Sequence, residues 1–217
     1  STCAVYGNPD RLPVDEDAAL GPSSPYGESK LQVERMLPWF NAGTGLRSIA
    51  LRYFNAAGAA LDGSNGESWD KATNLVPVVL RVAAGQAPAV HVFGTDYRTH
   101  DGTAVRDYVH VLDVAEAHVR AVDHLAAGGP SLVLNIGTGQ GTSVREILDR
   151  ARSVTGRAIP SIDAPRRPGD IPEVWAATGR SAHSIGWRAR YGIDEILESA
   201  WRWHTTHPAG HRDPGAT

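Results

Sequence analysis

Tyr26 and Lys30 are the pair whose types and spacing most directly suggest chemistry. They stand at the two ends of the sequence YGESK, so on a helix their side chains share one face. An ammonium group next to a phenol favours the phenolate, which could take up a proton as a general base. By itself this spacing more often marks a solvated tyrosine and lysine on a helix surface, so the context has to decide.

The surrounding patterns alternate between helix and strand, which predicts an α/β fold with parallel strands. Ser24 before Pro25 offers a cap for the helix that carries Tyr26, and Asp113 is expected to cap a later helix. The predicted helices cover 26–40, 74–84, 113–124, 143–154 and 194–205, and the predicted strands cover 47–53, 89–93 and 132–136, with a strand edge at 1–6 and a frayed tail at 208–217.

Composition excludes several classes of protein. The net charge is -3 and no basic cluster is present, so we expect neither a nucleic-acid partner nor an anionic membrane. No apolar run approaches the roughly 20 residues needed to cross a bilayer, and the first residues do not form a signal peptide. The single cysteine, Cys3, suits a reducing cytoplasm. The histidines lack metal-binding spacing, so no metal site is expected.

The glycine-rich stretch at residues 137–141 follows a predicted strand and precedes a predicted helix. It therefore invites interpretation as a dinucleotide-binding fingerprint. The third glycine of that pattern would fall at Thr142, and no βαβ unit of the right form surrounds it. We interpret the stretch as a tight turn followed by a helix cap.

Several further motifs accompany the tyrosine–lysine pair in a fixed order. They are STCAVYG at 1–7, PYGESK at 25–30, RYFN at 52–55, NLVP at 74–77, FGTDY at 93–97, DGT at 101–103, VRDYVHV at 105–111, NIGTG at 135–139 and APRRPGD at 164–170. Together they resemble the extended short-chain dehydrogenase/reductase family, and within it the UDP-glucose 4-epimerases, from residue 1 to about 207. The resemblance implies the C-terminal part of a Rossmann-type parallel sheet plus a smaller α/β substrate-binding lobe.

The resemblance implies NAD as cofactor and a catalytic set of Tyr26, Lys30 and Thr2. Tyr26 matches the base that takes a proton from the sugar 4-hydroxyl while a hydride passes to the nicotinamide, and the hydride later returns to the other face of the 4-keto sugar. Lys30 matches the lysine that holds the nicotinamide ribose. Thr2 matches a hydroxyl that bridges the sugar and the phenol, although it could be an ordinary strand threonine. Tyr53 matches a residue beside the nicotinamide.

For the substrate, the resemblance implies a UDP-sugar. Arg106 and Arg167 match arginines that bind the diphosphate, as forked guanidinium groups do, and Asp170 matches the acid that accepts hydrogen bonds from the uridine ribose. Phe93 matches an aromatic wall of the uracil pocket. The remaining implied substrate-binding positions are Asn55, Asn74, Leu75, Tyr108 and Val174; of these Tyr108 could instead be core packing.

The resemblance implies that Val174 lies beside the sugar, where a small side chain leaves room. We therefore hypothesise that an N-acetylated hexose is tolerated. The resemblance also makes a homodimer through the helix of Tyr26 and Lys30 plausible by analogy.

One feature departs from the family pattern, because no glycine-rich strand–turn–helix for the NAD pyrophosphate occurs in the 217 residues. We therefore expect an N-terminally truncated chain that is inactive alone and exposes an apolar sheet edge. Residues 1–73 would be the remnant of the NAD-binding domain and residues 74–207 mainly the UDP-sugar-binding lobe with some Rossmann elements. The alternatives are a UDP-sugar-binding or pairing module without redox activity, and a related epimerase or dehydratase; Cys3 and Ala4 after Thr2 argue against dehydration.

Overall fold

The structure is a computed structural model that describes residues 1–217 except 69–71, 209 and 211–217. The expected frayed tail falls almost wholly outside the described residues. The helices are η1 (Cys3–Val5, a 3-10 helix), α1 (Pro25–Thr44), α2 (Leu75–Ala83), α3 (Val111–Ala126), α4 (Val144–Thr155), α5 (Gly179–Ile185) and α6 (Ile193–Thr206). The strands are β1 (Ile49–Tyr53), β2 (Asn55–Ala57), β3 (Val90–Phe93), β4 (Val105–Arg106), β5 (Tyr108–His110), β6 (Leu132–Ile136), β7 (Thr142–Ser143), β8 (Ser161–Ala164) and β9 (Glu173–Val174).

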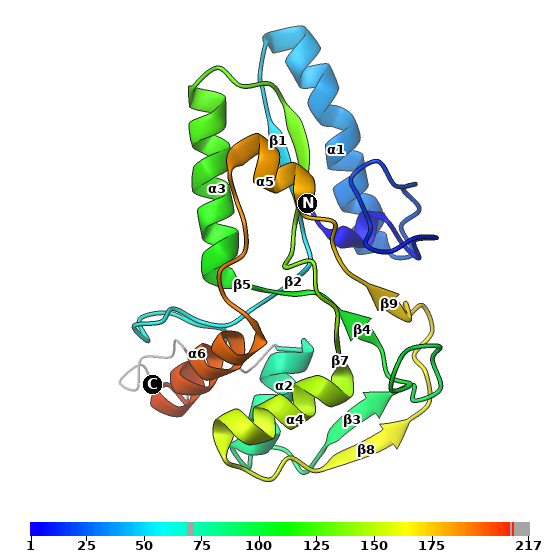
Figure 1. The fold of residues 1–217 in the computed structure, drawn as a ribbon, viewed down its shortest axis with the longest axis vertical. Coiled ribbons are helices and arrows are strands. Elements are labelled where there is room, and N and C mark those ends of the chain that lie inside the picture. The colour runs from blue at the N-terminus through cyan, green and yellow to red at the C-terminus, as the bar shows by residue number, and fades with distance from the viewer. Residues whose placement is uncertain (69–71, 209, 211–217) are drawn as a thin grey trace, which may run out of the picture.

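The upper part of the molecule in Figure 1 is built on the parallel pair β1–β6, with α1 and α3 on either side. Ile49 lies opposite Leu132 and Tyr53 opposite Ile136. Leu134 and Trp187 are buried in the core that this pair shares with α3 and α5. The parallel pairing and the alternation of strands with helices confirm the predicted α/β class.

The lower part holds the parallel pair β3–β8 and the helices α2, α4 and α6 (Figure 1). Its apolar core joins the buried faces of these three helices and includes Leu80, Ile147 and Leu197. Between the two parts, β2 pairs with β5 in parallel, and β4 pairs with both β7 and β9. The β4–β9 register places Arg106 opposite Val174, two residues that the sequence predicted for one site.

Helix α1 begins as its sequence predicts. The Ser24 side chain accepts a hydrogen bond from the Gly27 N–H at 3.1 Å, and Pro25 is the first helical residue. The helix continues past the predicted end at residue 40 and stops at Gly45, whose φ of 72° is the left-handed conformation that ends many helices.

Two local predictions were wrong. Residues 1–6 do not form a strand edge, because only Thr2 pairs with Tyr53 before its side chain caps the 3-10 helix η1. Asp113 does not cap α3, since the cap is His110, whose Nδ1 accepts from the Leu112 N–H at 3.1 Å. Asp113 lies in the first turn and instead accepts hydrogen bonds from backbone N–H groups of the segment that precedes α6.

Candidate functional site

A cavity of about 440 Å³ lies where η1, the start of α1, the strands β2 and β4, and the start of α2 meet. It gathers most of the side chains that the sequence predicted for catalysis and binding. Those that line it are Thr2, Tyr26, Tyr53, Asn55, Asn74, Leu75, Arg106, Tyr108 and Val174. They come from segments far apart in the chain, so this grouping is a property of the fold.

Tyr26 is the exposed phenol of this cavity. It lies in the first turn of α1 and is 57% exposed. The Lys30 Nζ lies 5.6 Å from the centre of the Tyr26 ring, as their spacing on a helix predicts. Lys30 itself lines a neighbouring hollow of about 340 Å³ between α1, β1 and α3.

The other two tyrosines of the cavity are less suited to lose a proton. Burial raises the pKa of Tyr108 to about 12. Burial, followed by the charge of Tyr26, raises the pKa of Tyr53 above its ordinary value. The Tyr53 hydroxyl also lies 2.6 Å from Nε2 of His118, on α3. These environments leave Tyr26 as the tyrosine best placed to act as a base.

Thr2 lies at the edge of the cavity, where it forms the N-cap of η1. Its Oγ1 accepts a hydrogen bond from the Ala4 N–H at 3.2 Å. A hydroxyl that accepts in this way can still donate its own hydrogen. Thr2 and Tyr26 line the same cavity, which the sequence prediction of a bridging hydroxyl requires.

The cationic side chain of the cavity is Arg106. Its Nη1 donates to the carbonyl oxygens of Val105 and Pro172, at 2.9 and 3.4 Å. Asn74 precedes α2 as its N-cap residue but makes no side-chain cap hydrogen bond. An arginine fork and an amide that line the same cavity form a set of donors suited to an anionic or polyhydroxyl ligand.

Three predicted site residues, Phe93, Arg167 and Asp170, lie outside the lining of this cavity and form a group of their own. The Arg167 Nε donates to Asp170 Oδ2 at 2.9 Å, and the guanidinium carbon lies 4.8 Å from the centre of the Phe93 ring. Ile171, the residue after Asp170, lines the cavity. The group therefore adjoins the cavity at its rim.

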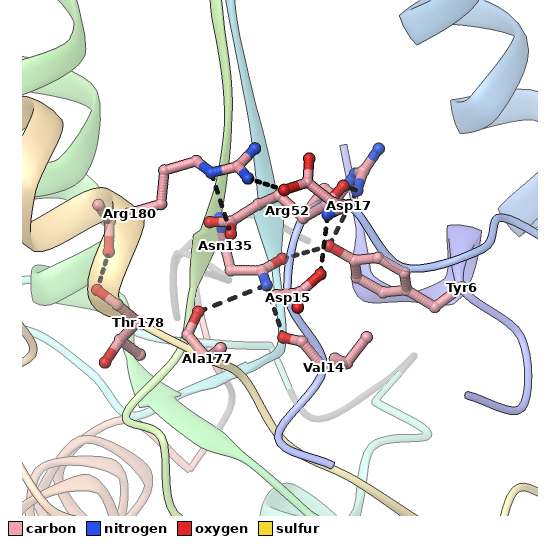
Figure 2. A network of polar contacts seen from close by, with 11 residues as sticks. Tyr6, Val14, Asp15, Asp17, Arg52, Asn135, Ala177, Thr178 and Arg180 are labelled. Atoms are coloured by element: carbon pink, nitrogen blue, oxygen red, sulfur yellow. Dashed lines mark hydrogen bonds and ion pairs between the residues drawn. The ribbon is translucent and has the colours of Figure 1, made fainter. Parts of the chain in front are cut away.

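A buried polar network positions α1, and the sequence did not indicate it. Arg52 donates through Nη2 to Glu34 of α1 at 2.6 Å and through Nη1 to the Tyr6 hydroxyl at 2.9 Å. The Tyr6 hydroxyl donates to Asn135, whose amide donates to the Val14 carbonyl. Figure 2 shows the part of this network that joins Tyr6, Val14, Arg52 and Asn135. Burial opposes the charge of Glu34, but hydrogen bonds from Arg52 and Ser1 hold its pKa below the usual range.

The glycine-rich stretch at residues 137–141 surrounds a carboxylate of the chain itself. Asp107 Oδ1 accepts from the Thr138 N–H and hydroxyl at 2.8 and 2.6 Å. Asp107 Oδ2 accepts from the Gly139 and Ala176 N–H groups at 3.0 and 3.1 Å. A Cβ on Gly137 would lie 2.5 Å from Asp107 Oδ2, so only glycine permits this approach. The stretch is thus a turn whose N–H groups bind a carboxylate of the same chain, which agrees with the interpretation of the sequence as a turn followed by a helix cap.

Asp107 is a second positioning residue that the sequence did not single out. It follows Arg106 directly, and its partner Ala176 stands two positions after Val174. One buried carboxylate therefore fixes the strands that carry both cavity residues. Burial raises the pKa of Asp107 above its ordinary value, while its four donors oppose that shift.

Comparison with known proteins assigns the chain to a family. The sequence profile of the NAD dependent epimerase/dehydratase family matches residues 1–137. The chain belongs to this family. Its Tyr26 and Lys30 fall inside the matched region, together with the cavity residues up to Tyr108.

Individual members of the epimerase/dehydratase family match almost the whole chain. A UDP-glucose 4-epimerase of Lacticaseibacillus casei is 47% identical over 98% of this chain and 65% of its own length. The crystal structure of a UDP-glucose 4-epimerase from Stenotrophomonas maltophila with bound NAD and formylated UDP-arabinopyranose has a TM-score of 0.93 and 43% identity, and covers 96% of this chain and 62% of its own. That from Bifidobacterium longum, in complex with NAD+ and UDP, has a TM-score of 0.91 and 40% identity, over 97% and 63%.

The chain spans about 65% of the length of the curated relatives that it matches. Across the described ranges, no group of three or more histidine, cysteine or acidic side chains could hold a metal ion. No helix in this part of the chain is both long enough and apolar enough to span a membrane.

Proposed function

We propose that this chain carries the catalytic and substrate-binding part of a UDP-glucose 4-epimerase that acts with NAD. The observation that carries the proposal is that Tyr26, Thr2 and Arg106 line one cavity and that the Lys30 Nζ lies beside the Tyr26 ring. The names of the relatives, and the NAD and UDP in two of the similar structures, support the same assignment.

The residues present fit the nicotinamide end of NAD. Tyr53 lines both the cavity and the neighbouring hollow, so the two spaces adjoin at this side chain, and Lys30 lines the hollow. Lys30 and Tyr53 would hold the nicotinamide and its ribose at this junction. When bound, NAD supplies a hydride acceptor that also returns the hydride.

Tyr26 is proposed to take the proton of the sugar 4-hydroxyl, and Lys30 to favour its phenolate. Thr2 donates a hydrogen bond that orients the same sugar oxygen. Arg106 binds the diphosphate by forked hydrogen bonds, with Asn55, Asn74 and Leu75 lining that wall. Tyr108 lies at the floor, and its buried hydroxyl is proposed to orient rather than to transfer protons.

Phe93 and Asp170 are proposed to receive the uridine half at the rim of the cavity, and Arg167 to bind the diphosphate together with Arg106. We also propose domain boundaries at residues 73 and 207. Residues 1–73 would hold the nicotinamide, and residues 74–207 would hold most of the UDP-sugar. A cytoplasmic location suits the single cysteine.

The first experiment compares this chain with a chimera that adds the unmatched part of the Lacticaseibacillus casei relative. We expect the chain to bind UDP without converting UDP-galactose, and the chimera to convert it with NAD. Activity of the chain alone would contradict the expected truncation. If the chain binds UDP and the chimera is nevertheless inactive, the results would favour the alternative of a binding module without redox activity.

Replacement of Tyr26 by phenylalanine in the active chimera tests the assignment of the base. General-base catalysis contributes about 10²- to 10⁴-fold, so kcat should fall by at least about 100-fold while UDP affinity stays unchanged. Tyr191→Phe, which alters a tyrosine packed against His110 and outside the cavity lining, is the matched control. Retention of more than a tenth of kcat by Tyr26→Phe would refute the role of Tyr26.

Val174 is proposed to leave room for an N-acetylated hexose. It lines the cavity opposite Arg106, and its side chain is smaller than an aromatic one. The chimera should therefore convert both UDP-galactose and its N-acetyl counterpart, and Val174→Tyr should reduce turnover of the second more than the first. No turnover of the N-acetylated sugar by the unaltered chimera would exclude this specificity.

A homodimer through α1 is proposed from the apolar side chains on its outer surface. Met36, Trp39 and Phe40 are exposed there, Trp39 by 76%. Three such side chains on one helix are typical of an interaction surface. Sedimentation equilibrium should show a dimer that Trp39→Glu dissociates, whereas Leu61→Glu, at an exposed residue away from α1, should leave it intact. A monomer at micromolar concentration would exclude the dimer.

A further inference from the structure

Two consecutive arginines at the rim of the cavity make similar contacts of different strength. Arg166 donates to Asp96 through Nε at 2.7 Å, donates again to the Asp96 carbonyl at 2.6 Å, and lies 4.3 Å from the centre of the Tyr97 ring. Arg167 lies 4.8 Å from the Phe93 ring. Its one recorded side-chain hydrogen bond within the described part of the chain goes to Asp170.

The contact of Arg167 is local and weak. The turn at residues 167–170 closes with the Asp170 N–H donating to the Arg167 carbonyl at 3.2 Å, and Gly169 permits it with a φ of 82°. The side chains are 58% exposed for Arg167 and 21% for Asp170. An ion pair this exposed contributes little to stability, and most N–H donors of the Arg167 fork remain available to another acceptor.

The same guanidinium covers both groups that the nucleoside would use. Under the proposed function, on which this inference rests, uracil packs on Phe93 and the ribose hydroxyls donate to Asp170. Arg167 lies over that ring and is bonded to that carboxylate. A phosphate is a better partner for an arginine fork than a partly solvated carboxylate with one hydrogen bond, because it accepts two parallel charge-assisted bonds.

We propose that Arg167 allows the uridine half to bind beside Phe93 and Asp170 only when the ligand also carries a diphosphate. It lies over Phe93 and pairs with Asp170 until a diphosphate draws the guanidinium away, so the site selects nucleoside diphosphates and rejects nucleosides. Arg167 is thereby a specificity-determining residue with two opposed effects, since it attracts the phosphates and obstructs the uridine half.

The test is a titration of UDP and of uridine into the 217-residue chain and its Arg167→Ala variant, followed by NMR chemical shifts. Loss of a charge-assisted hydrogen bond should weaken UDP binding by about tenfold or more. Removal of the obstructing ion pair should tighten uridine binding by about two- to five-fold. Arg166→Ala is the matched control and should change both affinities by less than about twofold.

The opposite changes expected in the affinities for UDP and for uridine distinguish this inference from a role of Arg167 in phosphate binding alone. Uridine affinity that falls or stays constant in Arg167→Ala, or UDP affinity that stays constant, would overturn the inference and leave the proposed function standing. Failure of the unaltered chain to bind UDP at all would refute the proposed function itself, and the inference with it.

Discussion

Replacing Asp107 by asparagine tests whether this buried carboxylate fixes the substrate side of the cavity. Asp107 is fully buried and accepts four hydrogen bonds from residues 138, 139 and 176. Asparagine keeps one acceptor oxygen, but its NH2 group must face either Thr138 or the N–H groups of Gly139 and Ala176. In the first orientation the Thr138 hydroxyl can turn to accept from the NH2 group, so that only the Thr138 N–H loses its acceptor. In the second orientation both N–H groups lose theirs, so the first is the less costly.

Each buried donor left without a partner costs about 1–3 kcal/mol. In the less costly orientation one donor is lost, so we expect about 1–3 kcal/mol. That is a large fraction of the roughly 5–15 kcal/mol by which domains are stable. Urea unfolding followed by circular dichroism should show the lower midpoint, with Asp10→Asn at an exposed loop position as the matched control.

The affinity of the Asp107→Asn variant for UDP distinguishes a role of Asp107 in positioning the cavity from a role in stability alone. The Asp107 carboxylate holds the strands that carry Arg106 and Val174, so at a temperature where the variant is still folded its affinity for UDP should also fall. A loss of less than about 1 kcal/mol, within the range of an ordinary surface substitution, would refute the reasoning. An unchanged UDP affinity in the folded variant would show that the loop, and not the cavity, depends on Asp107.

Two further predictions concern other buried titratable groups. Burial lowers the pKa of His110, whose Nε2 lies 3.0 Å from Ser199 Oγ, so the folded state resists protonation. The contribution of neutral His110 to stability is complete above the unfolded pKa of about 6.5 and is lost as the pH falls below that value. The variant His110→Asn keeps a side chain that can cap α3, and should therefore lose less stability than the unaltered chain between pH 7.5 and 5. Equal losses in the two proteins would contradict this prediction. Glu34→Gln leaves Arg52 with its buried charge uncompensated, at side-chain exposures of 7% and 3%, and should cost about 2–4 kcal/mol in urea unfolding. The exposed Glu28→Gln on the same helix should cost less than about 1 kcal/mol, and an equal effect of the two variants would disprove the buried pair's role.

Local patterns in the sequence were sufficient for most of the elements. The helix of Tyr26 and Lys30 and its Ser24 cap depend on contacts within a few residues, which are readable from periodicity and capping. The strand at residues 132–136 was predicted from its compact run of apolar residues. The two local errors also have local causes. A threonine that caps a 3-10 turn looks like the end of a strand, and a histidine cap at residue 110 is less typical than the aspartate three positions later.

The tertiary structure decided what these elements bring together. Asp107 contacts a turn 31 residues away, Arg52 contacts Glu34 across 18 residues, and Arg167, three residues past the end of β8, lies on Phe93 at the end of the paired strand β3. The sequence does not encode these contacts as a pattern, because each depends on how distant elements pack. Sequence motifs thus predicted which residues form the site, whereas strand pairing and buried polar contacts determined which of them share the cavity and which lie at its rim.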